Sequence, residues 1–136
     1  MSRKTARENA YKLVFEYLFN KEKDSLSYRG LIENPNVAKE DLDFISSLYL
    51  GVVEHFDDVV EKISRNAKGF SLERIYKPDL TAMIIAVYEM TYTTTPKTVA
   101  ISEALELVKA YSTEKSGSYV NGILASVYRE LSDETK

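Results

Sequence analysis

Apolar residues recur along this chain with the three-to-four-residue spacing of α-helices. The apolar positions of the first segment form one stripe, made of Ala6, Ala10, Leu13, Val14, Tyr17 and Leu18. Such a stripe predicts an amphipathic helix that buries one face. A shorter helical segment is expected over residues 26–32, and it ends at the loop-forming string Asn34-Pro35-Asn36.

A longer periodic run follows, with apolar positions at Leu42, Ile45, Tyr49, Val52, Val53, Phe56, Val60 and Ile63. The run is too long for one ordinary helix. We therefore expect a bend near His55-Phe56-Asp57, with Asp57 as the cap of the second helix. Gly69-Phe70 ends this segment, and residues 73–77 are expected to form a turn or a 3₁₀ piece.

The second half of the chain predicts three further helices. The segment from Pro78 to Met90 is apolar on nearly all sides, which predicts a central helix. The next helix carries apolar positions at Ala100, Ile101, Ala104, Leu105, Val108 and Tyr111. Ser116-Gly117-Ser118 is expected to separate it from a last helix, with Val120, Ile123, Leu124, Val127 and Leu131 inward. No segment alternates as a strand does, so we expect an all-α fold, a compact bundle of about seven helices.

The composition is that of a soluble globular protein, with 44% hydrophobic and 29% charged residues in a chain of 136. This length allows one domain, or two small subdomains that share a core. The absence of Cys excludes thiol chemistry and fits a reducing compartment. No apolar run approaches the ~20 residues of a membrane span, and no secretory signal is recognisable. We therefore expect a cytoplasmic protein without a membrane partner.

The residues needed for catalysis are missing. One His and no Cys leave no nucleophile–base pair. Gly117 and Gly122 have P-loop spacing, but the Lys-Ser/Thr of a P-loop does not follow them. A metal site of Glu54, His55 and Asp58 fits by spacing alone, and the lack of a second His argues against it. We expect a binding protein without enzymatic activity or cofactor.

A cluster of cations opens the first helix, although the net charge of the chain is -3. Its members are Arg3, Lys4, Arg7 and Lys12. At 100° per residue, one strip beside the apolar face contains Lys4, Arg7, Tyr11 and Phe15. Cations beside aromatic rings suit a single strand of nucleic acid, because cations meet phosphates and rings stack on unpaired bases. The alternative is a solvated helix start with two partly buried rings. Positive charge at a helix N-terminus is disfavoured by ~0.3–1 kcal/mol, which favours a partner.

Several strings resemble those of a known family. They are Val87-Tyr88-Glu89-Met90, the segment VAISEALELVK at residues 99–109, and Tyr119-Val120-Asn121-Gly122-Ile123-Leu124. Two more are Thr5-Ala6-Arg7-Glu8-Asn9-Ala10 and Leu50-Gly51-Val52. In this order they resemble the NusB family of bacterial transcription antitermination factors, from Arg3 to Leu131, with residues 20–39 matching least.

The resemblance implies one NusB-like helical domain with two subdomains, about residues 1–68 and 69–136. It implies binding to the boxA element of nascent ribosomal RNA together with NusE, a ribosomal protein. The complex would let RNA polymerase read through termination signals, and it would have no catalytic activity.

The resemblance also implies site residues. Those facing RNA would be Arg3, Lys4, Arg7, Phe15, Lys115 and Tyr119. Glu73 and Asp79 would face NusE, where acids suit a basic ribosomal protein. This chain has fewer arginines at its start than many members, so we expect weaker and less salt-dependent RNA binding. Asn121-Gly122 is expected to serve helix packing and capping.

Two other functions compete with this interpretation. A NusB-like bundle also forms the N-terminal part of some ribosomal RNA methyltransferases. Because the chain ends at Lys136 without a Rossmann sheet for S-adenosylmethionine, we expect no such activity from it alone. The second alternative is a purely protein-binding helical adaptor, in which Tyr11, Phe15 and Tyr119 dock a helix. Tyr119 could also be a core residue.

Overall fold

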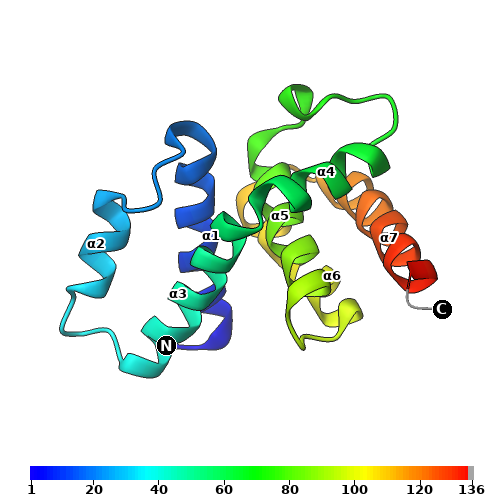
Figure 1. The fold of residues 1–136 in the computed structure, drawn as a ribbon. Helices are drawn as coiled ribbons and strands as arrows, with labels where there is room; N and C mark the ends of the chain where they lie inside the picture. The colour runs from blue at the N-terminus through cyan, green and yellow to red at the C-terminus, as the bar shows by residue number, and fades with distance from the viewer. Residues whose placement is uncertain (135–136) are drawn as a thin grey trace. The chain divides into compact units, whose positions relative to one another are not determined.

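The computed structural model describes residues 1–134, which form seven α-helices and one short 3₁₀ helix (Figure 1). No strand occurs within these residues, so the expected all-α fold of about seven helices is confirmed. None of the helices in this part of the chain is long and apolar enough to cross a membrane. The chain divides into two compact units, and the second begins at His55.

The first unit contains α1 (Arg3–Asn20), α2 (Leu26–Ile32) and α3 (Lys39–Glu54). Helix α1 packs against α3. The predicted stripe of α1 is buried at Ala6, Ala10, Leu13 and Val14, and α3 buries Ile45, Leu48, Tyr49 and Val52. Burial of each large aliphatic side chain contributes ~1.5–3 kcal/mol, so this seam is the main source of stability in the unit.

Helix α2 forms where the sequence predicts it, but none of its residues is buried. Leu26 is 84% exposed. The helix is attached through Tyr28, whose hydroxyl donates to Ser46 Oγ at 3.0 Å and whose ring lies 5.0 Å from that of Tyr49. The Tyr49 hydroxyl donates to the carbonyl of Lys23 at 2.7 Å, and burial raises the pKa of Tyr49 to about 12.

The second unit contains α4 (Phe56–Asn66), a 3₁₀ helix η1 (Leu72–Arg74), α5 (Lys77–Tyr92), α6 (Lys97–Tyr111) and α7 (Ser116–Glu134). Helix α5 contacts α4, α6 and α7. All of its residues from Asp79 to Met90 are buried, as expected for a helix that is apolar on nearly every side. The 3₁₀ piece also forms close to the predicted position.

Two helix boundaries differ from the sequence-based expectation. The break before α4 is present, but His55 occupies the cap position without a side-chain cap bond, and Asp57 lies inside the first turn. Helix α7 begins at Ser116, so Ser116-Gly117-Ser118 belongs to the helix instead of separating two helices. The side chain of Ser116 bonds to Thr113 at 2.8 Å, which stabilises this earlier start.

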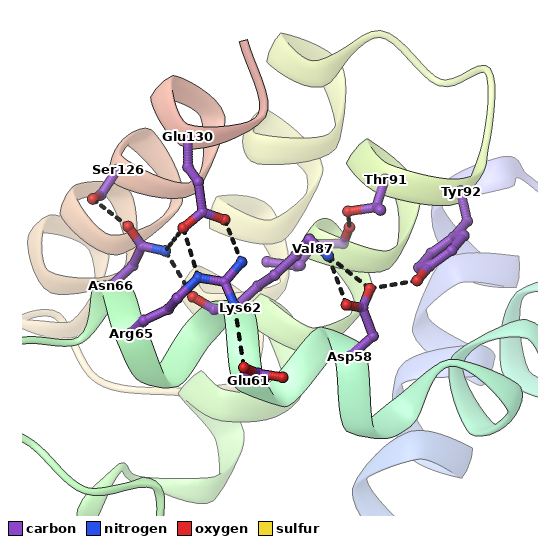
Figure 2. A network of polar contacts seen from close by, with 10 residues as sticks. All are labelled: Asp58, Glu61, Lys62, Arg65, Asn66, Val87, Thr91, Tyr92, Ser126 and Glu130. Carbon is purple, nitrogen blue, oxygen red and sulfur yellow. Dashed lines mark hydrogen bonds and ion pairs between the residues drawn. The ribbon is translucent and has the colours of Figure 1, made fainter. Parts of the chain in front are cut away.

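Helix α4 belongs to the second unit, whereas the resemblance implied a subdomain boundary near residue 68. It packs against α5 and α7, and polar contacts fasten it to α7 (Figure 2). Arg65 donates two hydrogen bonds to the Glu130 carboxylate, at 2.9 and 2.8 Å. Ser126 donates to the Asn66 side-chain oxygen at 2.6 Å. The apolar period alone does not reveal these long-range partners of α4.

Candidate nucleic-acid interface

The start of α1 presents cations without acids. Ser2 caps the helix, because its hydroxyl accepts a hydrogen bond from the Thr5 backbone N–H at 3.1 Å. The cap fixes the register of the first turn, which contains Arg3 and Lys4 and no acid. Lys4 is exposed and has no ion-pair partner within residues 1–134. Its ammonium group is therefore available to a phosphate.

The two arginines of this helix lie over one ring of α3. The Arg3 guanidinium carbon is 4.1 Å from the Phe44 ring centroid, and that of Arg7 is 5.5 Å away. Cation–π contacts of this kind hold a guanidinium in place while its charge remains. Arg3 is exposed, whereas Arg7 is only 7% exposed. Of the two arginines, Arg3 is the accessible one, and Arg7 is largely a packing residue.

The aromatic residues of the predicted strip, Tyr11 and Phe15, differ from each other in exposure. Tyr11 is 3% exposed and belongs to the core, so its ring is not available to stack on a base. Phe15 is half-buried, and its ring meets that of Phe19 edge to face at 5.1 Å. Phe19 is 64% exposed. The sequence reasoning missed Phe19, although its spacing of four residues from Phe15 places both on one helix face.

The remaining predicted RNA-facing residues belong to the second unit. Lys115 is exposed immediately before α7, and Tyr119 lies in the second turn of that helix. The Tyr119 ring meets Phe70 edge to face at 5.5 Å, and Tyr119 is half-buried. Its hydroxyl is buried without a hydrogen-bond partner in the described residues. Burial, and then the nearby negative charge of Asp79, raise the pKa of Tyr119.

The two acids predicted to face a protein partner have different environments. Glu73 is exposed on η1. Asp79 is 4% exposed, and its carboxylate accepts a short hydrogen bond from Ser112 Oγ at the end of α6. Ser112 in turn bonds to Ser116 at 3.1 Å. Asp79 therefore links the start of α5 to the end of α6 and, through Ser112, to the start of α7. Glu73 is the accessible acid of the pair.

Asp58 and His55, two side chains of the metal site considered from spacing, make other contacts. The Asp58 carboxylate accepts two hydrogen bonds from Lys62, at 2.8 and 2.7 Å, and one from the Tyr92 hydroxyl (Figure 2). These bonds lower the pKa of Asp58, with Lys62 the larger cause. The His55 ring stacks on Tyr92 with centroids 3.7 Å apart. Within residues 1–134 no group of three metal-ligating side chains comes together.

Comparison with known proteins gives consistent matches over the length of the chain. The family model described as "NusB family" matches residues 4–129. A transcription antitermination protein NusB from Finegoldia magna is 42% identical over 130 residues, covering 95% of both chains. One from Clostridium novyi is 36% identical over 132 residues, covering 95% of this chain and 99% of the relative.

Solved structures agree with these matches. T. maritima NusB superposes with a TM-score of 0.83 at 29% identity, covering 96% of this chain and 92% of the other. A structure of the antitermination factors NusB and NusE with double-stranded RNA gives a TM-score of 0.82 at 23% identity, covering 94% and 96%. At 23% identity, the similarity to the NusB and NusE structure shows only a shared fold. With a family model that spans residues 4–129 and full-length relatives, the chain belongs to the NusB family.

Proposed function

We propose that this chain is a transcription antitermination factor that binds boxA-containing single-stranded RNA of nascent ribosomal transcripts together with NusE. Membership of the NusB family carries the proposal, because its relatives are transcription antitermination proteins. The chain would help to assemble an antitermination complex on RNA polymerase. It acts by binding and not by catalysis, as its antitermination relatives do.

The start of α1 is the proposed phosphate-binding edge. Lys4 and Arg3 are exposed there, and the first turn contains no acid to repel a phosphate. Phe15 and Phe19 offer ring surface further along the same helix. Unpaired bases stack on such rings at ~1–3 kcal/mol each. In the second unit, Lys115 and Tyr119 are a further proposed contact with RNA.

The segment around η1 is the proposed contact with NusE. Glu73 is exposed on η1, and the exposed side chains of Phe70 and Tyr76 flank it. An acid between two exposed aromatic side chains suits a basic protein, since tyrosine and other large rings are frequent anchors of protein interfaces. Asp79 is buried at the start of α5 and accepts a hydrogen bond from Ser112, so Glu73 is the acid proposed to meet NusE.

The test is binding of a boxA-containing RNA strand and a scrambled strand at two or more salt concentrations, with and without NusE. Lys4→Ala should weaken RNA binding and reduce the slope of log K against log salt by about 0.7, the value for one lost contact with single-stranded phosphate. Lys23→Ala is the matched control, because Lys23 is exposed beyond the other end of α1. Equal effects of the two substitutions would contradict the proposed edge.

The partner surface is tested separately. Glu73→Lys should reduce the gain in RNA affinity that NusE provides, while binding of RNA alone is unchanged. Glu106→Lys, which changes an exposed acid on α6, is the control. Absence of boxA preference by the wild type, with NusE present, would refute the antitermination function.

A further inference from the structure

A pocket of about 480 Å³ lies between the last turns of α6 and the first turns of α7. Its volume is within the range of small-molecule sites, about 300–1,000 Å³. Leu105 and Val108 of α6 contribute apolar surface, and Ser118 and Asn121 of α7 contribute polar groups. Glu114, in the connection between the helices, also lines it. The pocket thus combines an apolar wall with polar groups.

Asn121 and Gly122 do not have the packing role expected from the sequence. Both are exposed. A Cβ added at Gly122 would meet no atom within 4 Å, so no neighbouring helix requires a glycine there. The Asn121 amide makes no hydrogen bond within residues 1–134 and lines the pocket. Its donor and acceptor atoms are therefore available to a ligand.

The chemistry of the pocket suits a nucleobase. A base has apolar faces, one of which the α6 wall around Leu105 can cover, and a polar edge. A side-chain amide offers a donor and an acceptor side by side, the pattern that pairs with base edges. The Glu114 carboxylate only accepts hydrogen bonds, so it favours a base with an exocyclic amino group and disfavours phosphate inside the pocket.

The position of the pocket connects it with RNA. Lys115 follows Glu114 directly, and Tyr119 lies between Ser118 and Asn121. Both Lys115 and Tyr119 are proposed RNA contacts. Lys109, a further lining residue, is exposed and can meet the backbone of a strand that enters.

We propose that this pocket binds one unpaired base of the RNA, a cytosine or adenine, and that Asn121 pairs with the edge of that base. The inference rests on the RNA-binding function proposed above. Single-stranded RNA is recognised in this way elsewhere, through bases that leave the stack and bond along their edges.

The experiment compares the wild type with Asn121→Ala and with Asn36→Ala, which removes an exposed amide from the loop before α3. Each protein is titrated with a boxA-containing strand and with strands in which one cytosine or adenine at a time is replaced by uracil. For the wild type and Asn36→Ala, one replacement should weaken binding about tenfold. For Asn121→Ala the same replacement should change affinity less than about twofold. Glu114→Gln should also reduce the discrimination.

The outcomes separate this inference from the function on which it rests. If the wild type prefers boxA but Asn121→Ala retains the same discrimination at every position, the pocket does not read a base, and the antitermination function stands. If the wild type binds no RNA even at low salt with NusE present, both proposals are wrong. Because Asn121 is exposed, the substitution is not expected to disturb folding, and a thermal melt checks this.

Discussion

Replacement of Tyr119 by Phe should stabilise the protein. The Tyr119 hydroxyl is shielded from solvent, and no group in the described residues accepts or donates a hydrogen bond to it. Leaving a buried polar group unpaired costs about 1–3 kcal/mol. Phenylalanine keeps the ring and its contact with Phe70, and it removes only the unpaired oxygen. We expect the free energy of unfolding to rise by about 1 kcal/mol, at the lower end because part of the ring is exposed.

The assay is thermal unfolding combined with urea titration. For a chain of 136 residues, a gain of about 1 kcal/mol corresponds to a rise of roughly 4 °C in Tm. Tyr92→Phe is the matched control in the same unit, because the Tyr92 hydroxyl donates to Asp58. That variant should lose about 1 kcal/mol. A fall in Tm for Tyr119→Phe, similar to that of Tyr92→Phe, would refute the reasoning.

The same substitution examines the role of the Tyr119 ring in RNA binding. Tyr119→Phe keeps a stacking surface, so its RNA affinity should remain within about twofold of the wild type. Tyr119→Ala removes the ring and should weaken binding by about 5- to 100-fold, corresponding to ~1–3 kcal/mol per stacked base. If alanine has no effect on RNA affinity while both variants fold, Tyr119 is a core residue only.

Four other predictions concern stability. Arg65→Ala should lower the free energy of unfolding by about 1 kcal/mol, since Arg65 makes a two-bond ion pair with Glu130, and a double-mutant cycle with Glu130→Ala measures the coupling. The pKa of Asp58 is lowered in the folded state, so its contribution to the free energy of unfolding is present above the unfolded value of 3.8. This contribution is lost as the pH falls through the folded pKa. In urea titrations at a series of acid pH values, Asp58→Asn should reduce this loss. The pKa of Tyr92 is raised to about 12, so its contribution is present below pH 10 and is lost as pH rises from 10 to about 12, a loss that Tyr92→Phe should reduce. Asp79→Ala should lower the free energy of unfolding by about 1–3 kcal/mol in a thermal melt, because it removes a buried charged acceptor; a loss below about 0.3 kcal/mol would contradict its structural role.

The helices were largely predictable from the spacing of apolar residues. The central position of α5 followed from its apolar surface on nearly every side, and α2 followed from a short helical pattern. The prediction for α5 succeeds because the spacing of the apolar residues that a helix buries can be read within one segment of the sequence. Helix α2 forms as expected although none of its residues is buried. The break between α3 and α4 was predictable because the apolar run is too long for one ordinary helix, whereas the choice of cap residue was not.

The burial and the contacts of the polar and aromatic side chains were less predictable. Arg7 and Asp79 looked like accessible charges, but each has a contact far away in the sequence, at Phe44 and Ser112 respectively. Tyr11 lies next to the apolar stripe, and the helical wheel does not tell whether another helix covers it. Such partners come from tertiary packing, which single-sequence periodicity does not contain.

The stacking of Arg3 on Phe44 has a consequence for association with RNA. A free arginine side chain has about 2 kcal/mol of rotamer entropy, part of which is lost when the side chain is fixed on a phosphate. The Phe44 ring already restricts Arg3 when the protein folds, so less of this entropy remains to be lost on binding. A chain with few arginines at its start can thus gain more affinity from each one. Its basic edge should behave as a preorganised surface, unlike a flexible cationic tail.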